Sequence, residues 1–137
     1  MSVTARTSGV RTFLIADIRG CSRYTEECGD EAAAALAKRF AEIVDEDVEA
    51  HDGELVEMRG DEALVVFTSA RQAIRAAVDL QAQFQEAATE FDIPLRVGIG
   101  IDSGEAVQLE DGSFRGAALN VAARLCVLEN IGGGPFR

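Results

Sequence analysis

The chain has no apolar run close to the roughly twenty residues that a membrane-spanning helix needs. Its first ten residues also lack the apolar core of a signal peptide. Basic residues are few: 13 Lys and Arg stand against 24 Asp and Glu, which gives a formal net charge of −11. Sequence-independent binding to nucleic acid or to an anionic membrane requires clustered Lys and Arg. We therefore expect a cytoplasmic protein with no membrane span and no nucleic-acid partner, to which a polyphosphate would come only as its metal complex.

Cysteine and histidine are also scarce. The three cysteines, Cys21, Cys28 and Cys126, are odd in number and do not form a C-x-x-C pair, which argues against a disulfide framework or a zinc site. Buried or half-buried reduced thiols are the favoured interpretation. The only histidine, His51, has no Ser or Cys constellation around it, so it gives little support to triad chemistry. We expect it on the surface near the end of a helix.

What is present is typical of one globular domain, with 137 residues of which 47% are hydrophobic and 27% charged. Apolar periodicity and turn signals predict an alternation of strands and helices. The predicted strands are 11–18, 54–58, 63–67, 95–101 and 104–109, and the predicted helices are a short one from residue 20 and longer ones over 30–51, 70–89 and 116–128. This order contains a β-α-β-β-α-β unit. It predicts an α+β fold with a ferredoxin-like core, a largely antiparallel sheet and helices on one face.

Finer features of these elements can also be predicted. Asp30 is a plausible N-cap of the first long helix, and Ser69 opens an S-x-x-Q capping box before the second. The apolar stripe of the first long helix comprises Leu36, Phe40, Ile43, Val44 and Val48. The stripe predicted for the second comprises Ile74, Ala77, Val78, Phe84 and Ala88. The segment 102–104 predicts a turn between the last two strands.

Two aspartates suggest a site. Asp17 ends the buried strand 11–18, and Asp61 lies in the tight turn between the strands of the predicted hairpin. On its own, either aspartate would more often be a turn or cap residue than a ligand. Two carboxylates that converge from a strand end and a neighbouring hairpin, however, form an arrangement that holds Mg²⁺ against a triphosphate.

Four motifs then resemble a known family, the class III adenylyl and guanylyl cyclases. The motifs occur in order, cover roughly residues 12 to 130, and are the segments D-I-R-G-C-S at 17–22, G-D-E-A-L-V-V-F at 60–67, I-G-I-D-S-G-E at 99–105 and G-A-A-L-N-V-A-A-R-L at 116–125. The resemblance implies that Asp17, Asp61 and the carbonyl of Ile18 hold two Mg²⁺ or Mn²⁺ ions per site. One ion would activate the ribose 3′-hydroxyl and the other would neutralise the triphosphate.

The same resemblance assigns the rest of the site. The backbone amides of Gly20, Cys21 and Ser22, at the start of the short helix, would hold phosphate oxygens. Asn120 would orient the ribose, and Arg124 would stabilise charge on the α-phosphate while pyrophosphate leaves. These two residues are four positions apart, so one helix face presents both. In the family they come from the other protomer, which implies a head-to-tail homodimer.

The positions that read the base depart from the adenylyl pattern. At the position of Glu57, adenylyl cyclases usually carry Lys and guanylyl cyclases carry Glu. At the position of Ser113, adenylyl cyclases carry Asp and guanylyl cyclases carry Cys. ATP and GTP both stay open. Arg59, in a usually apolar position, could pair with Asp61 or meet a phosphate. The family domain usually continues beyond the last helix, so we expect an extension at 1–10, a truncated cyclase homology domain at 11–130 and a tail at 131–137.

The leading hypothesis is a nucleotidyl cyclase that makes a 3′,5′-cyclic nucleotide and pyrophosphate from ATP or GTP, in cyclic-nucleotide signalling. The first alternative is a cyclase-homology module that dimerises and regulates with little or no turnover. The second is a ferredoxin-like protein-interaction domain without nucleotide, which requires all four motifs to be coincidental.

Overall fold

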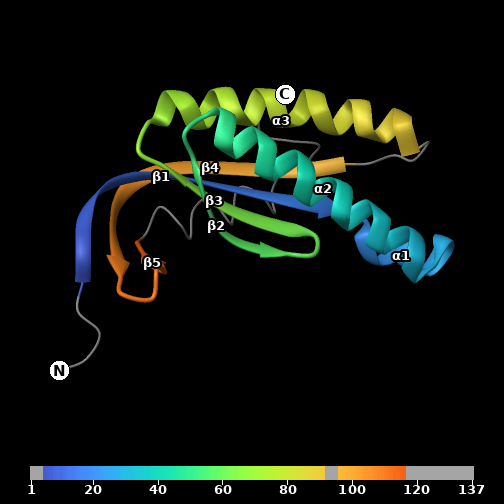
Figure 1. Cartoon of the computed structure of the whole chain (residues 1–137), viewed down its shortest axis with the longest axis horizontal. Helices are drawn as coiled ribbons and strands as arrows, with labels where there is room; N and C mark the ends of the chain where they lie inside the picture. Colours follow the sequence, from blue (N-terminus) through green and yellow to red (C-terminus); the bar gives the residue numbers. More distant parts are fainter. Residues whose placement is uncertain (1–4, 92–95, 117–137) are drawn as a thin grey trace.

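The computed structural model describes residues 5–91 and 96–116. In chain order the elements are β1 (Ala5–Arg19), α1 (Cys21–Cys28), α2 (Asp30–Ala50), β2 (Glu54–Arg59), β3 (Glu62–Phe67), α3 (Ala70–Phe91), β4 (Arg96–Leu109) and β5 (Phe114–Arg115). Figure 1 shows α2 and α3 side by side above the sheet, with β1 and β4 running beneath them. The helix predicted over 116–128 lies outside the described residues, apart from Gly116.

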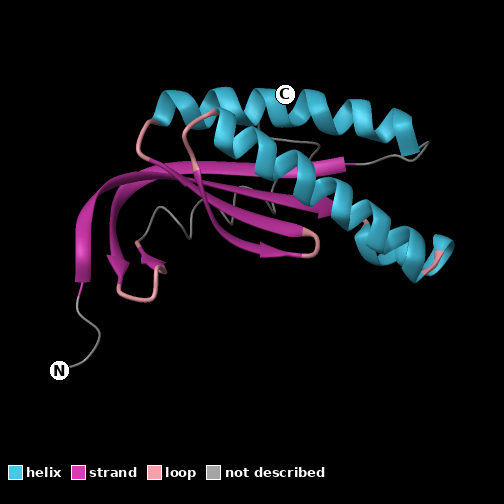
Figure 2. Cartoon of the chain, in the orientation of Figure 1, coloured by secondary structure: helices cyan, strands magenta, loops and turns pink. Residues whose placement is uncertain are grey.

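The strands form one sheet in the order β2-β3-β1-β4-β5, and every pair of neighbours is antiparallel. Its first four strands have the ferredoxin-like order, and β5 adds a short edge. Helices and strands segregate into two layers, as Figure 2 shows. The predicted α+β fold with a ferredoxin-like core and helices on one face is thus confirmed. Within the described ranges, no helix is both long and apolar enough to cross a membrane.

The main core lies between the helices and the sheet. The stripe predicted for α2 is confirmed, because all five of its apolar members are buried there. Phe40 of α2 stacks on Phe84 of α3 with ring centroids 5.5 Å apart. A second, smaller cluster lies on the other face of the sheet and comprises Phe13, Ile15, Val66, Ala106 and Phe114. Alternate residues of β1 therefore face opposite sides of the sheet.

The predicted apolar stripe of α3 is wrong in part: Phe84 is buried and Ala77 packs against the main core, but two other members are exposed. Ile74 and Val78 are 58% and 67% exposed. The buried residues of this helix are Ala73, Ala76, Leu80, Phe84 and Ala87. Three of them are alanines, which allow close packing but give a weak hydrophobic signal. The larger Ile74 and Val78 therefore shifted part of the predicted stripe toward the exposed face.

The predicted turn at 102–104 is also wrong. Residues 96–109 form a single strand, β4, which pairs with β1 along its whole length, including Asp102 opposite Phe13 and Ser103 opposite Thr12. The hydroxyls of Thr12 and Ser103 share a hydrogen bond of 2.6 Å. The strand β1 is longer than the predicted 11–18 and begins at Ala5, so a continuous partner overrides the local turn propensity.

The helix caps, the free cysteine and His51 agree only in part with the predictions. The cap of α3 is confirmed, since the Gln72 amide donates to the Ser69 hydroxyl at 3.2 Å. Gly29, and not Asp30, is the N-cap of α2, and Asp30 lies in the first helical turn. Cys28 is a free thiol as expected, but it is exposed. The prediction of a surface position for His51 is wrong: its side chain is only 13% exposed at the end of α2, where α3 packs against it.

Candidate active site

Asp17 lies near the end of β1, on the face of the sheet opposite the helices. Along β1, Leu14, Ala16 and Ile18 belong to the main core, so Asp17 continues the row of Phe13 and Ile15 on the other face. Its side chain is 24% exposed. Partial burial raises the pKa of Asp17, Arg19 lowers it, and the charge of Asp61 raises it further. A positive charge bound beside Asp17 would therefore stabilise the ionised form of its carboxyl group.

Asp61 lies at the tip of the β2–β3 hairpin, next to the end of β1. The turn requires Gly60 in a left-handed conformation, with φ of 33°. The backbone of Asp61 is tied to β1, because the amide of Ile18 donates to its carbonyl at 2.8 Å. The side chain is exposed, and its charge acts on Asp17. The structure thus brings together the two segments that carry the predicted metal-binding aspartates.

A third carboxylate, which sequence reasoning missed, lies near the two aspartates. Glu62 lies directly opposite Asp17 in the register of β3 and β1. Partial desolvation raises the pKa of the exposed Glu62, and the neighbouring charges of Asp17 and Asp61 add to the effect. Residues paired across antiparallel strands point to the same face. A predicted hairpin register would have located Glu62 beside the aspartates. This donor set suits Mg²⁺ or Mn²⁺, which prefer carboxylate oxygens.

Arg19 is the other residue that sequence reasoning missed. Its Nη1 lies 3.3 Å from Asp17 Oδ2, and its side chain is 12% exposed. Among the described residues, its buried Nε and Nη2 have no hydrogen-bond partner. The guanidinium lies over Gly98, where a Cβ would come within 2.7 Å of Nη2. The alternation of β1 could have predicted that Arg19 and Asp17 share a face, but not that they pair.

The proposed phosphate-binding segment starts α1. Gly20 precedes the helix with φ of 74°, and no side chain caps it. Cys21 and Ser22 form the first turn of this helix. The first amides of an α-helix have no partner within the helix, so those of α1 can donate hydrogen bonds to an anion beside the end of β1.

The two proposed base-reading residues lie at opposite edges of the sheet. Glu57 is on β2, where its Oε2 pairs with Nε of Arg59 at 2.8 Å, so Arg59 pairs with Glu57 and not with Asp61. Ser113 lies in the β4–β5 turn, and its hydroxyl and amide both donate to Asp111 Oδ1, at 2.6 and 2.9 Å. Both residues thus have local partners. Asn120 and Arg124 lie outside the described residues, so the second half of the proposed site stays a prediction.

Known proteins resemble this chain over most of its length. The family described as "Adenylate and Guanylate cyclase catalytic domain" matches residues 3–118. "Putative adenylate cyclase 3" of Rhizobium meliloti (strain 1021) is 34% identical over 127 residues, which are 88% of this chain and 21% of that protein. An uncharacterised protein of Mycobacterium tuberculosis (strain ATCC 25618 / H37Rv) is 32% identical over 120 residues, 86% of this chain and 39% of its own length. The chain therefore spans well under half of these curated relatives.

Solved structures agree with the sequence comparison. The crystal structure of an adenylate/guanylate cyclase/hydrolase from Silicibacter pomeroyi is 32% identical, with a TM-score of 0.74, and the match covers 89% of this chain and 71% of that one. The guanylyl cyclase Cya2 has a TM-score of 0.81 at 22% identity, covers 91% and 73% of the two chains, and shows the shared fold. With residues 3–118 matched by the family, this chain belongs to the adenylate and guanylate cyclase catalytic domain family.

Proposed function

We propose that this chain is the catalytic domain of a nucleotidyl cyclase, which converts ATP or GTP into a 3′,5′-cyclic nucleotide and pyrophosphate. The proposal rests on one observation: the segments that carry Asp17 and Asp61 lie side by side. The backbone amide of Ile18 donates a hydrogen bond to the carbonyl of Asp61. The cytoplasmic location and the role in cyclic-nucleotide signalling remain predictions from the sequence.

Two divalent cations would be held by Asp17, Asp61 and the carbonyl of Ile18. When bound, they would lower the pKa of the ribose 3′-hydroxyl and neutralise the negative charge of the triphosphate. The first amides of α1 would bind phosphate oxygens in this site. The 3′-hydroxyl would lose its proton to solvent. Its oxygen would bond to the α-phosphorus while the bond from that phosphorus to the leaving pyrophosphate oxygen breaks.

The partner subunit in a head-to-tail homodimer would supply the remaining groups. Asn120 would orient the ribose, and Arg124 would donate hydrogen bonds to the α-phosphate as negative charge develops there. Glu57 can accept hydrogen bonds from the guanine edge and would contact adenine poorly, so it favours GTP. Ser113 can donate or accept and is compatible with either base.

The direct test is turnover of ATP and of GTP with Mn²⁺ by the purified chain, with the cyclic product separated by chromatography. We expect product, and we expect Asp17→Ala or Asp61→Ala to abolish it. Asp45→Ala is the matched control, because Asp45 is exposed on α2 in the helix layer. Unchanged turnover in either site variant would remove the metal-binding role.

Sharing of the site between protomers needs a separate test. Asp17→Ala and Arg124→Ala protomers should each be inactive alone, and a mixture should regain activity, because each heterodimer contains one intact composite site. Heterodimer formation is checked with two affinity tags. Heterodimers that form without any recovery of turnover would contradict the head-to-tail arrangement.

A regulatory module with little turnover is the second candidate. The ion pair between Arg19 and Asp17 favours it, since a side-chain cation already occupies one oxygen of the carboxylate. A chain that binds Mn²⁺ and nucleotide but forms no cyclic product would support this candidate over the enzyme.

A further inference from the structure

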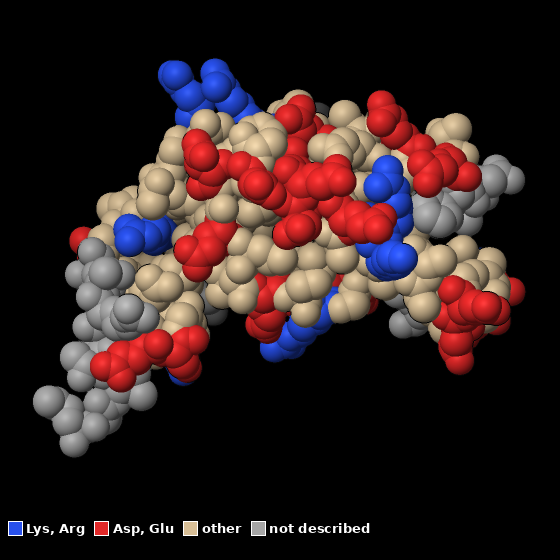
Figure 3. Space-filling model, viewed as in Figure 1, with Lys and Arg blue, Asp and Glu red and all other residues tan. Residues whose placement is uncertain are grey.

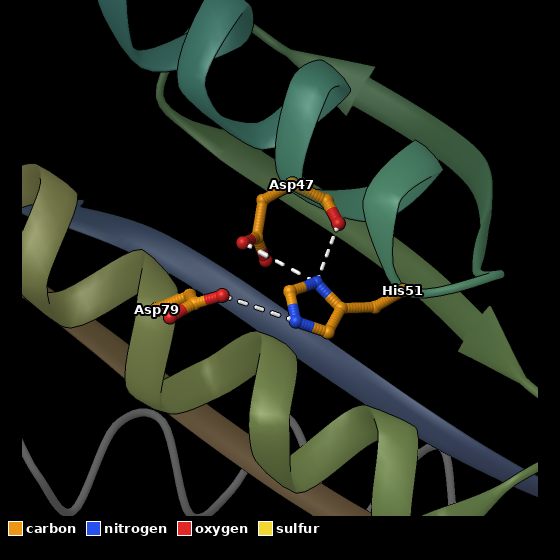
Figure 4. Close-up of side chains that lie close together, drawn as sticks. All are labelled: Asp47, His51 and Asp79. Carbon is orange, nitrogen blue, oxygen red and sulfur yellow. Dashed lines mark hydrogen bonds and ion pairs between the residues drawn. The ribbon is translucent and has the colours of Figure 1, made fainter.

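Three potential metal ligands meet in the helix layer, away from the proposed active site. Figure 4 shows Asp47 and His51 at the end of α2 and Asp79 on α3, with all three side chains turned toward one another. One ligand atom from each lies within 4.8 Å of the others. Asp17 lies on the opposite face of the sheet, so this cluster, Asp47–His51–Asp79, is not part of the proposed cyclase site.

His51 is held in an orientation that suits a ligand. Its Nδ1 lies 2.8 Å from the backbone carbonyl of Asp47, a contact that requires a proton on Nδ1. In a neutral ring, Nε2 is then the unprotonated nitrogen, and it lies 3.1 Å from Asp79 Oδ2. A lone pair facing a carboxylate is repulsive unless a proton or a cation lies between them. Metal-binding histidines typically donate their other ring N–H to a carbonyl or carboxylate, as here.

The surroundings of Asp47 indicate whether a proton or a metal cation lies between His51 and Asp79. Its side chain is 1% exposed, and among the described residues its buried Oδ2 has no hydrogen-bond partner. Its Oδ1 accepts from Gln83 Nε2 at 3.3 Å and lies 3.4 Å from His51 Nδ1. A proton on His51 Nε2 would satisfy Asp79 but would leave Oδ2 of Asp47 unpaired. A cation bound by all three residues would also satisfy that oxygen, which is costly to leave buried and unpaired.

The geometry and surroundings fit a metal of the zinc type. Two ligand atoms of a tetrahedral zinc ion lie about 3.3 Å apart, close to the spacing of His51 Nε2 and Asp79 Oδ2. Asp79 is 58% exposed and gives the ion access from solvent. Figure 3 shows acidic side chains gathered on one face of the molecule. The helix α2 alone carries four exposed acidic residues near the cluster in sequence, Glu42, Asp45, Glu46 and Glu49. Such a surface attracts cations.

We propose that Asp47, His51 and Asp79 form a second cation site, which binds Zn²⁺ or a similar divalent transition metal through one imidazole and two carboxylates. The imidazole distinguishes it from the oxygen ligands expected for Mg²⁺ at Asp17 and Asp61. Water would complete the coordination. The ion would clamp the end of α2 to α3, and the proposal does not depend on cyclase activity.

The test uses the full chain carrying Asp17→Ala and Asp61→Ala, which removes the proposed catalytic ligands. Calorimetric titration with Zn²⁺ should show one ion per chain, and Co²⁺ should give the visible absorption of a site with a nitrogen ligand. At a hundredfold excess over Kd, Zn²⁺ should raise Tm by roughly 5–10 °C. Adding His51→Gln or Asp79→Asn should weaken binding at least about tenfold and remove most of the Tm shift.

Asp45→Asn is the matched control for charge, because Asp45 is exposed on α2 outside the cluster. Circular dichroism verifies that each variant is folded, and Asp79→Asn is the safer variant because Asp79 is mostly exposed. Absence of saturable Zn²⁺ binding would overturn the proposal. So would binding that persists in both His51→Gln and Asp79→Asn, or that falls equally in Asp45→Asn.

Discussion

Replacement of Gly98 by Ala tests how Arg19 and Asp17 are coupled. A Cβ at this position would lie 2.7 Å from Nη2, 2.8 Å from Nε and 3.1 Å from Cζ of Arg19. Ordinary contact needs about 3.5 Å, so the guanidinium has to retreat by about 0.8 Å. The ion pair, now 3.3 Å between Nη1 and Asp17 Oδ2, would then lengthen to the limit of a direct contact. The flexible arginine end moves easily, and the backbone is expected to stay in place.

Gly98→Ala is expected to lower the stability of the fold and to raise the affinity for Mn²⁺. A partly exposed ion pair contributes about 1 kcal/mol, so Gly98→Ala should lower the free energy of unfolding by about that amount. A cation binding at Asp17 would no longer compete with Arg19, and 1 kcal/mol corresponds to a roughly fivefold lower Kd for Mn²⁺. Arg19→Ala should tighten Mn²⁺ binding in the same direction, which makes it the matched comparison.

Mn²⁺ binding is measured by calorimetry on the nucleotide-free chain, and stability by urea unfolding. A folded Gly98→Ala variant with unchanged or weaker Mn²⁺ affinity would refute the view that Arg19 competes for Asp17. A loss of more than about 3 kcal/mol would also refute it, because that cost indicates backbone strain or overpacking and not a displaced side chain.

Three further predictions concern the core, base selection and pH. Leu80→Ala should lower the free energy of unfolding by about 2–5 kcal/mol, since Leu80 is fully buried, whereas Val78→Ala on the exposed face of the same helix should change it by less than about 0.5 kcal/mol in urea unfolding. Glu57→Lys should shift the ratio of GTP to ATP turnover toward ATP, and an unaltered ratio would mean that Glu57 does not read the base. Burial raises the pKa of Asp47 to about 6, an effect that His51 partly offsets. The folded chain therefore binds more protons than the unfolded chain between the ordinary value of 3.8 and about 6. With EDTA present, the free energy of unfolding contributed by Asp47 should fall as pH rises through this window, and Asp47→Asn should remove that part of the slope.

The sequence was most informative where a residue's surroundings are local. The apolar run of 11–18 placed Asp17 at the end of a buried strand, and the glycine turn placed Asp61 at a hairpin tip. The α2 stripe was predicted correctly because large side chains repeat on one face with charged residues elsewhere. The family motifs depend on the same local spacings, which is why they identified the fold before any contact was known.

Prediction failed where a distant partner decides the outcome. The turn signal at 102–104 was overridden by β1, whose hydrogen bonds continue through that segment. The pairing of Arg19 with Asp17 depends on the absence of a side chain at Gly98, on a strand about eighty residues away in sequence.

By itself, then, the sequence determined the order of elements, the family and the two aspartates, because short-range periodicity and turn chemistry encode them. Only the tertiary structure decided which face of α3 packs against α2. The orientation of α3 about its axis depends on three small alanines that carry little hydrophobic signal. The same orientation places Asp79 beside His51. The cluster of Asp47, His51 and Asp79 follows from packing between helices, which residue spacing along a single chain segment does not encode.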